Sequence, residues 1–384
     1  MKVFTFKENG EINGNIKGLD ARWCLLYSTC TSEYRNVINE IKNTYPDIDV
    51  FGATSFQGTF SPAGFQRGGS FLIGESKDEI NVKAVIDAFD VNEARKRSLS
   101  LAEKIKEGLG DLPDVILMHA TPGFEERIIE GINDFYGNEV PVYGGSAGDD
   151  DLTGKWKIFL NLKEVSEGLL LVGIKSRKKI YSGFLSGYLP TNKKGKVTKA
   201  EGRIIYEIDN RPAAIVYNEW TNNLISEELE KGGVILGKTT LYPIGRIIEK
   251  IAGVPFYLLS HPHMVFPDKK SLSFFTEFKE GDEVILMHGS VNALIDRTEQ
   301  VASRALGLDK GKAKLYGGIL IYCAGCVGAV GEKREEIIDA YKKIVGDIPF
   351  IGAATFGEQG CFRTKGGENK HGNLMCNTIL FGEI

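Results

Sequence analysis

One sequence pattern recurs along the chain and limits its fold more than any other feature. The pattern is an apolar strand, a polar turn, an amphipathic helix and a second apolar strand that runs into a glycine-rich turn. These turns lie at 52–58, 144–149 and 352–360. A fragment of a fourth copy is present, because residues 284–288 repeat residues 115–119 letter for letter. The chain is therefore predicted to consist of duplicated units with special backbone at equivalent strand ends, where a ligand would bind.

The duplicated units predict an α/β fold. A strand-helix-strand passage forms parallel, right-handed pairs, whereas the strands that follow each unit are close enough to form antiparallel hairpins. We therefore expect mixed parallel and antiparallel sheets with flanking helices, in an internally duplicated two-lobe architecture. A chain of 384 residues is longer than one core usually supports. The boundary is expected between 175 and 195, giving domains 1–180 and 181–384.

Local patterns place the elements. In the first lobe, strands are predicted at 24–28, 50–54, 69–75, 80–89, 115–119, 141–145, 156–162 and 168–174, and helices at 33–45, 92–109 and 124–135. In the second lobe, strands are predicted at 180–188, 196–208, 255–259, 271–278, 283–288, 318–323, 349–354 and 373–381, and helices at 212–223, 292–307 and 332–345. Asn92 is the expected cap of the second helix and Gly110 its stop.

Composition excludes several classes of protein. The net charge is -4 and no long Lys/Arg run occurs, so nucleic acid is not an expected partner. The sequence begins without a signal-peptide pattern, and no apolar stretch is long enough to span a membrane. Six cysteines are too few for a disulfide scaffold. A cytoplasmic protein with reduced thiols and no membrane association is predicted.

The turn at 144–151 is the first candidate site. Gly144, Ser146 and Gly148 have the spacing of a G-x-S-x-G nucleophile elbow, but aspartates follow where that motif requires a helix. The alternative is a tight turn in which the Ser146 hydroxyl and the Asp149 carboxylate hold a polar ligand, including an ammonium group. A purely structural alternative remains, in which the aspartates close the turn through local backbone hydrogen bonds.

A second candidate is Cys323 and Cys326, a C-x-x-C pair at a strand-to-helix junction. Such a pair can be a redox pair or half of a metal site. Cys361, His371 and Cys376 could complete a metal site, but their spacing matches no zinc or iron-sulfur pattern. The preferred interpretation is that the thiols line a pocket wall, with Cys326 open to reaction because it starts a helix.

The turns at 52–58 and 352–360 form a third candidate. Thr54, Ser55 and Thr355 supply hydroxyls on backbone that glycine frees, and Glu358 supplies a carboxylate. These groups could orient a polar small molecule, or they could satisfy the backbone of the turn. No H-E-x-x-H, P-loop or dinucleotide G-x-G-x-x-G occurs in a strand-to-helix setting, which disfavours phosphoryl transfer and nicotinamide chemistry.

Taken together, these residues resemble the FIST family, whose members carry a FIST N and a FIST C domain. The matching segments, in chain order, are 52–55, 144–149, 211–213 with Tyr217, 323–325, 357–360, and Asn373 with 377–378. Two positions depart from the family pattern: Cys326 stands where the family tends to carry arginine, and Gln359 where it tends to carry an aliphatic residue. Any anion contact made by that arginine is therefore not expected here.

The resemblance implies a sensor of signal transduction that binds a small ligand, with amino acids or their derivatives as candidates, and that lacks a defined enzymatic activity. No cofactor is expected. The output would be a separate signalling protein such as a kinase, cyclase or chemoreceptor. The expected ligand-binding residues are Thr54, Ser55, Gly145, Ser146, Asp149, Cys323, Cys326, Thr355, Glu358 and Asn373.

Two other functions stay open at the level of sequence. One is a hydrolase or acyltransferase that uses Ser146 or Cys326 as its nucleophile. The other is a metal or iron-sulfur protein built on the C-terminal cysteines. All three hypotheses depend on the same spatial expectation, that the turns around positions 52, 146, 324 and 356 converge on one hollow.

Overall fold

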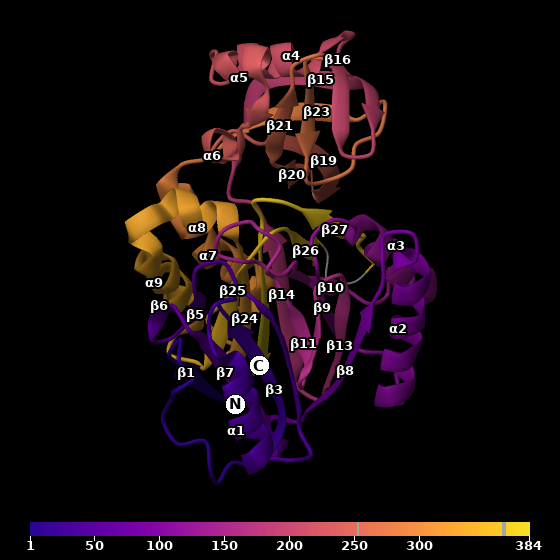
Figure 1. Cartoon of the computed structure of the whole chain (residues 1–384). Helices are drawn as coiled ribbons and strands as arrows, with labels where there is room; N and C mark the ends of the chain where they lie inside the picture. Colours follow the sequence, from indigo (N-terminus) through magenta and orange to yellow (C-terminus); the bar gives the residue numbers. More distant parts are fainter. Residues whose placement is uncertain (252, 363–365) are drawn as a thin grey trace.

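The structure is a computed structural model that describes residues 1–251, 253–362 and 366–384. It has two parts (Figure 1). The body comprises residues 1–185 and 291–384 and contains three mixed sheets with helices on their outer faces. The upper domain comprises residues 189–288 and contains one nine-stranded sheet. The predicted α/β fold, with mixed sheets in a duplicated two-lobe layout, is confirmed.

Each sheet of the body is built on one copy of the repeated unit. The first unit contains β3 (Ala21–Ser28), α1 (Tyr34–Thr44), β4 (Asp49–Thr54) and β7 (Gly69–Glu75), with β1 (Lys2–Phe6) and β2 (Ile12–Asn13) at the sheet edge. The second contains β9 (Val115–Ala120), α3 (Glu125–Tyr136), β10 (Val142–Gly145) and β13 (Gly168–Ser176), with β8 (Ile80–Ala88) and α2 (Ala94–Leu109). The third contains β24 (Lys314–Cys323), α8 (Ala324–Val330), α9 (Arg334–Val345), β25 (Phe350–Thr355) and β28 (Cys376–Glu383), with β14 (Lys179–Leu185) and α7 (Val291–Leu306). In every unit the two strands that flank the helix pair in parallel.

The three units exchange hairpins in a cycle. Each unit sends the hairpin after its glycine-rich turn into the sheet of a neighbour. The hairpins are β5–β6 (Thr59–Ser61, Gly64–Gln66), β11–β12 (Ile158–Leu160, Lys163–Val165) and β26–β27 (Glu358–Cys361, Asn369–Gly372). The first pairs with β25 of the third unit, the second with β4 of the first, and the third with β10 of the second. The glycine-rich turns are therefore the crossing points at the centre of the body.

Repeated glycines permit this close approach of strands. A Cβ on Gly52 would lie 1.7 Å from the carbonyl oxygen of Leu26, and one on Gly144 would lie 1.9 Å from that of Met118. Gly352 has the equivalent place in the third unit and faces a carbonyl of β24 at 2.5 Å. Because real Cβ atoms do not approach a carbonyl so closely, only glycine fits. The recurrence of these glycines is thus explained by strand packing.

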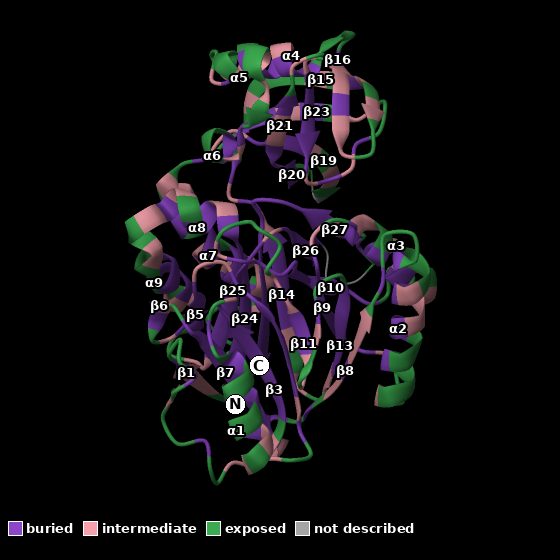
Figure 2. Cartoon of the chain, viewed as in Figure 1, coloured by how far each residue is buried: buried purple, intermediate pink, exposed green. Residues whose placement is uncertain are grey.

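Strand alternation buries both faces of these sheets (Figure 2). On β3, Leu25 and Tyr27 point into the core shared by all three sheets, whereas Cys24 and Leu26 pack beneath α1. Successive side chains of a strand point to opposite faces, so one apolar run serves two cores. This explains why the repeated strands are almost continuously apolar.

Two predicted hairpins are wrong. The strands at 69–75 and 80–89 exist, but β7 pairs with β3 whereas β8 pairs with β13 in another sheet. The strands at 156–162 and 168–174 separate in the same way, because β11 joins β4 and β13 joins β9. The short links between these strands, such as η1 (Ser76–Asp78), cross from one sheet to another. Each strand pairs with a long strand of its own sheet in place of the predicted hairpin partner.

Two helix starts also differ from prediction. The cap position of α2 is Glu93, with no side-chain hydrogen bond, so the predicted cap at Asn92 is wrong. Asn92 donates its own N–H to Asp90 at 2.8 Å, which turns the chain before the helix begins. The predicted stop at Gly110 is confirmed by its left-handed conformation. In the third unit a helix begins directly at Ala324, and α9 follows it at Arg334.

The upper domain is a largely antiparallel layer with short helices on one side (Figure 1). Its strands are β15 (Leu189–Glu201), β16 (Ile204–Ile208), β17 (Arg211–Pro212), β18 (Gly233–Val234), β19 (Ile244–Ile251), β20 (Val254–Ser260), β21 (Pro262–Phe266), β22 (Ser271–Phe274) and β23 (Glu283–His288). Its helices are α4 (Ala213–Trp220), α5 (Ser226–Lys231) and α6 (Leu236–Thr239). The fragment of a fourth unit forms β23, which pairs with β15 and β19 and not with a parallel partner, so it does not start a fourth unit. The domain boundary predicted at 180/181 falls within β14, which pairs with β28 in the body.

Candidate functional site

The three glycine-rich turns meet at the centre of the body. The backbone hydrogen bonds that join them, each 2.9 Å long, run from Gly148 to Thr54, from Ser146 to Gly357 and from Phe56 to Ala354. Convergence of these turns was expected from the sequence. They are tied directly to one another, and most of their polar groups are partnered within the protein, although Oε1 of Gln359 is buried without a hydrogen-bond partner.

The predicted ligand-binding residues are all buried, and those other than Gly145 have exposed fractions of 5% or less. Thr54, Ser55, Gly145, Ser146, Thr355 and Glu358 come together at the crossing of the turns. Asp149 accepts the N–H groups of Leu152, Thr153 and Lys155 and so closes its own turn. Their role in ligand binding remains a prediction.

Glu358 is a buried carboxyl group inside this crossing. Its two oxygens accept hydrogen bonds from the Thr355 hydroxyl at 2.8 Å and from the Met375 backbone N–H at 2.9 Å. Burial raises the pKa of Glu358 to about 8, and these two hydrogen bonds offset only part of that effect. Glu358 is therefore expected to keep its proton at neutral pH.

Behind the Ser146 hydroxyl lies a charged cluster that joins the body to the upper domain. Ser146 donates to Oε1 of Glu125 at 2.7 Å, and Arg203 donates to Oε2 of Glu125 at 2.7 Å. The same guanidinium donates to Glu126 at 2.5 Å. Glu125 and Glu126 open α3 in the body, whereas Arg203 lies on the turn between β15 and β16. We call Glu125, Glu126 and Arg203 the latch.

Two further contacts extend the latch. Glu126 accepts the backbone N–H of Glu277 at 2.9 Å, and Nε2 of His371 lies 3.3 Å from the carbonyl oxygen of Phe275. Both backbone groups belong to the upper domain. Gln359 donates to Nδ1 of His371 at 3.2 Å, which positions the imidazole from below. The upper domain is therefore held to the body by several polar contacts at one place.

The charges in the latch compensate one another. Burial alone would raise the pKa of the Glu125 carboxyl. The neighbouring His371 and Arg203, together with hydrogen bonds from Arg203 and Ser146, outweigh burial and hold that pKa below its usual range. Glu125 is thus a buried carboxylate whose charge depends on an arginine supplied by the other part of the molecule.

Glu125, Glu126 and His371 also have metal-ligand chemistry. Their ligand atoms lie within 4.8 Å of one another, and in the described ranges they make the one such group. The Arg203 guanidinium contacts both carboxylates, so a protein cation already balances their charge. Of the described residues, no cysteine belongs to a group of this kind, although the C-terminal cysteines were a predicted alternative.

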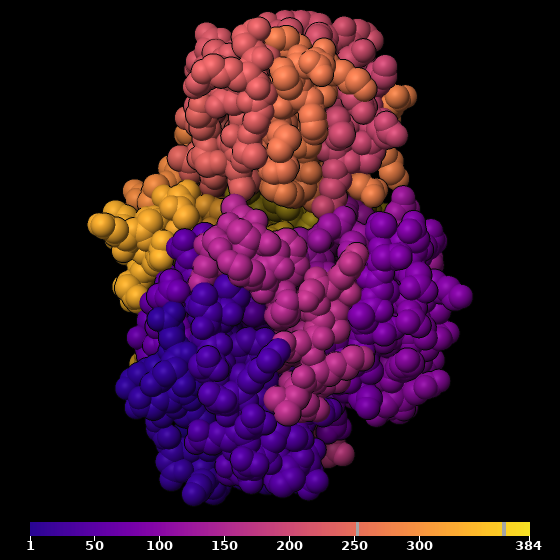
Figure 3. All heavy atoms as spheres, in the orientation of Figure 1, coloured from indigo at the N-terminus to yellow at the C-terminus, as the bar shows by residue number. Residues whose placement is uncertain are grey.

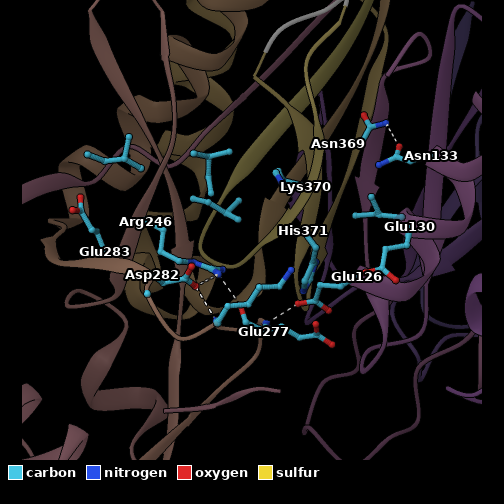
Figure 4. Close-up of a pocket in the computed structure, with 16 residues that line it drawn as sticks. Glu126, Glu130, Asn133, Arg246, Glu277, Asp282, Glu283, Asn369, Lys370 and His371 are labelled. Carbon is cyan, nitrogen blue, oxygen red and sulfur yellow. Dashed lines mark hydrogen bonds and ion pairs between the residues drawn. The ribbon is translucent and has the colours of Figure 1, made fainter. Parts of the chain in front are cut away.

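A cleft of about 540 Å³ lies next to the latch, between the upper domain and the body (Figure 3). Figure 4 shows Arg246, Glu277 and Asp282 of the upper domain across from Glu126, Glu130 and His371 of the body. Arg246 donates to the carbonyl oxygen of Glu277 at 2.7 Å and lies 3.3 Å from Asp282. Lys279 and Lys370 add two ammonium groups to the lining. The cleft therefore offers both signs of charge to a bound molecule.

The remaining predicted residues border the upper domain. Asn373 donates its N–H to the carbonyl oxygen of Leu259 at 2.9 Å, and its side chain accepts from the N–H of His261 at 3.3 Å. Cys323 ends β24 and Cys326 lies in the first turn of α8. These residues are grouped with the connections between the two parts and not with the cleft lining.

The structural context of a serine hydrolase is missing around Ser146. A nucleophile elbow requires a helix directly after the serine, whereas residues 147–157 contain none. The Ser146 hydroxyl is fully buried and donates to Glu125, so it does not face the cleft. The elbow spacing of glycines arises here from strand crossing.

The sequence contained a signal for some of the latch residues but not for all of them. Glu125 and Glu126 follow the predicted strand 115–119 and open the next helix, which places them at the strand edge where Ser146 lies. An acidic pair at that edge was a usable signal. Arg203 lies within the predicted strand 196–208, and no local pattern distinguishes it from a solvated surface arginine.

No helix in the described part of the chain is long and apolar enough to cross a membrane. Among known proteins, an uncharacterised protein of Methanocaldococcus jannaschii is 27% identical over 193 residues, which are 48% of this chain and 37% of that protein. The match thus spans little more than a third of that relative's length. Among solved structures, that of PurLQS from Thermotoga maritima matches over 80% of this chain and 73% of its own chain, at 11% identity and with a TM-score of 0.24.

Family models give the clearest result. The FIST N domain matches residues 22–211, and the FIST C domain matches residues 213–361. FIST domains are associated with sensing in signal transduction. The junction between the two matches lies within the upper domain, so each matched region contributes to both parts of the structure. The chain belongs to the FIST family, with a FIST N domain followed by a FIST C domain.

Proposed function

We propose that this FIST protein senses a small zwitterionic metabolite, with an amino acid as the first candidate, in the cleft between the upper domain and the body. One observation carries the proposal: the cleft is lined by both parts and borders the latch that joins them. A volume of about 540 Å³ is within the range of small-molecule sites. No chemical step is proposed.

The charges of the lining support this class of ligand. Lys279 can hold a ligand carboxylate. Lys370, Glu126 and Glu130 already pair with Glu368, Arg203 and Arg127, and they can exchange these partners for the charged groups of a ligand. Arg246 is engaged by Asp282 and stacks on Phe278 at 4.3 Å, so it is fixed in place before any ligand arrives.

Glu126 can couple ligand binding in the cleft to the contact between the body and the upper domain. Its carboxylate lines the cleft and also accepts hydrogen bonds from Arg203 and Glu277 of the upper domain. A ligand that binds Glu126 therefore acts on the contact between the two parts. A ligand shifts such an equilibrium only by its difference in affinity for the two arrangements.

The predicted turn residues have a supporting place in this proposal. Gly357 lies directly beneath His371, since a Cβ there would be 2.5 Å from the imidazole. Glu358 on β26 pairs with Gly145 on β10, and β26 also pairs with β27, the strand that carries His371. The polar groups at the crossing thus hold the floor of the cleft in position.

The setting and the partner belong to the same proposal. None of the six cysteines forms a disulfide, which fits the reducing cytoplasm; they are Cys24, Cys30, Cys323, Cys326, Cys361 and Cys376. The output would be a separate signalling protein, such as a kinase, cyclase or chemoreceptor, that contacts a surface moved by the upper domain.

A thermal-shift screen of the amino acids and small carboxylates tests the proposal, with protein refolded from denaturant to remove bound ligand. A ligand at about 100 times its Kd stabilises by about 2.7 kcal/mol, which is readily measured. We expect a subset of amino acids to raise the Tm in a concentration-dependent way. Absence of a shift for every compound would contradict a zwitterion sensor.

A charge-reversal pair locates the binding site. Lys279→Glu changes the cleft lining, and Lys312→Glu makes the same change in charge at an exposed position outside it. We expect the first variant to weaken binding of the hit by about tenfold, or about 1.4 kcal/mol, and the second to leave it unchanged. Equal effects of the two would place the ligand elsewhere.

A further inference from the structure

Arg297 is a fully buried arginine with an incomplete set of partners. It lies on α7, and its Nη1 donates to the carbonyl oxygens of Leu374 at 2.8 Å and Ser186 at 3.2 Å. Its Nε and Nη2 atoms have no hydrogen-bond partner. No carboxylate oxygen of the described residues lies within 4.0 Å of its guanidinium, which stacks on Tyr322 at 3.9 Å.

A buried guanidinium needs a counter-charge, because an isolated charge is strongly disfavoured in a protein interior. Glu358 is a carboxyl group that Arg297 influences, but burial raises its pKa to about 8, so it is expected to stay protonated at neutral pH. Arg297 also acts on Tyr188, Tyr322, Cys376 and Cys326. Burial raises the pKa of the first three and keeps them neutral, whereas the pKa of the Cys326 thiol is lowered. The surroundings therefore favour a thiolate at Cys326.

The Tyr188 hydroxyl also lies near the sulfur. It is 3.5 Å from Cys326, but it donates its proton to the carbonyl oxygen of Thr240 at 2.8 Å, so it positions the sulfur without stabilising its charge. Burial alone would raise the pKa of Cys326, but a hydrogen bond from Cys323 and the charge of Arg297 outweigh it and lower that pKa. The Cys323 pKa is raised, so one member of the pair is a thiolate and the other a thiol. Nucleophilic and resolving cysteines differ in this way.

We propose that Cys323 and Cys326 form an oxidation site that takes a hydroperoxide, with Cys326 as the nucleophile, Arg297 as its counter-charge and Cys323 as the resolving thiol. The site is independent of any ligand in the cleft. It lies beneath residues 186–188, the first connection between the body and the upper domain, and Tyr188 also donates to the carbonyl oxygen of Thr240 in that domain.

The proposed reaction balances. The Cys326 thiolate attacks one oxygen of hydrogen peroxide, the O–O bond breaks, and the leaving hydroxide takes up a proton to become water. The sulfur of Cys323 then attacks the sulfenic acid of Cys326, forming an S–S bond and releasing a second water. Two thiols lose two electrons and two protons to one hydroperoxide. Local opening of the connection gives a small peroxide access to the buried sulfur.

Cys30 provides an internal control. It is more exposed than Cys326, but burial raises its pKa, and the charges of Asp149, Asp150 and Asp151 act in the same direction. Because the thiolate is the reactive form, Cys326 should react with peroxide before Cys30 despite its deeper burial. Reactivity governed by exposure alone would give the opposite order.

The experiment is a time course of hydrogen peroxide with the native reduced protein, followed by alkylation and peptide mass spectrometry. We expect a Cys323–Cys326 disulfide to form before Cys30 is modified, and the Cys323→Ser variant to stop at a sulfenic acid that dimedone traps. Oxidation of Cys30 first, or no disulfide between Cys323 and Cys326, overturns the proposal.

Variants test the counter-charge separately from the cysteines. Arg297→Met should slow disulfide formation at neutral pH by on the order of tenfold, since each unit of thiol pKa changes the thiolate fraction about tenfold. If that variant fails to fold, the pH dependence of the native protein tests the same point. With the pKa of Cys326 lowered to about 6, the rate of disulfide formation should level off above about pH 7, whereas an ordinary thiol would still gain about tenfold per pH unit. An unchanged rate in a folded Arg297→Met variant, or a rate that keeps rising above about pH 7, overturns the assigned role of Arg297.

Discussion

At the scale of single residues, the glycines and buried acids decide what the centre of the body can do. Gly52, Gly144 and Gly352 recur because strands cross there without room for a Cβ. Their repetition in the sequence correctly predicted special backbone. The repetition could not show whether a ligand or another strand lies against this backbone, since close approach of either requires glycine.

Gly144→Ala tests this assignment. The new Cβ would lie 1.9 Å from the Met118 carbonyl oxygen, and the residue has a φ of +152°. We expect a loss of more than about 3 kcal/mol in the free energy of unfolding, measured in urea, because backbone must move. Gly237→Ala is the control, since no atom lies within 4 Å of its Cβ position. A Gly144 variant as stable as the control would refute the strand-crossing role.

Glu358 gives the protein a specific pH dependence. Its folded pKa of about 8 is above the usual value of 4.5, so between these values the folded state binds more protons than the unfolded state. This contribution to stability is fully present below pH 4.5 and is lost as the pH rises towards 8. Glu358→Gln removes the titration.

Unfolding in urea from pH 5 to 8 measures the effect. We expect the stability difference to shift in favour of Glu358→Gln by about 1.4 kcal/mol per pH unit across this window. A difference that does not vary with pH would mean that the buried carboxyl is already ionised in the folded protein.

At the scale of elements, the sequence predicted most strands and helices but not their partners. The runs at 69–75 and 80–89 were correctly predicted as strands, yet β7 and β8 lie in different sheets. Alternating or apolar patterns indicate that a segment is extended and buried, and they contain no information on which neighbour it meets. The cyclic exchange of hairpins depends on tertiary packing, so these patterns could not predict it. They could not predict which residues meet at the candidate site for the same reason.

The latch belongs to the same scale, because it joins the β15–β16 turn to the first turn of α3. Arg203→Met should destabilise the protein by about 3–5 kcal/mol, since Glu125 would remain buried without its partner. Adding Glu125→Gln should recover part of that loss, which a double-mutant cycle in urea would detect. Strictly additive effects would contradict a coupled pair.

The Arg35–Glu164 pair is the matched control for the latch. It is also an arginine-carboxylate contact between distant segments, but the Arg35 side chain is 66% exposed. Arg35→Met should have a far smaller effect on unfolding than Arg203→Met, because solvent screens the exposed pair.

At the scale of the whole molecule, the body and the upper domain share polar and apolar contacts. The polar contacts include the latch beside the cleft, the interface around Asn373 and the connections above the buried Arg297. Apolar packing joins them as well, for example Phe256 on Phe362 with ring centroids 5.6 Å apart. The sequence predicted that the turns converge on one hollow. The turns do converge, but they are tied directly to one another, and none of their residues lines the cleft. The cleft is instead lined by β27, α3 and the upper domain, whose adjacency depends on how the two parts pack against each other.

Hydrogen-deuterium exchange with and without the best amino-acid hit tests the cleft most directly. The proposal predicts slower exchange on both of its walls at once, in residues 125–133 and 369–371 of the body and 244–249 and 277–283 of the upper domain. Slower exchange confined to the turns at 52–58, 144–149 and 354–358, or to one wall only, would contradict a ligand held between the two parts.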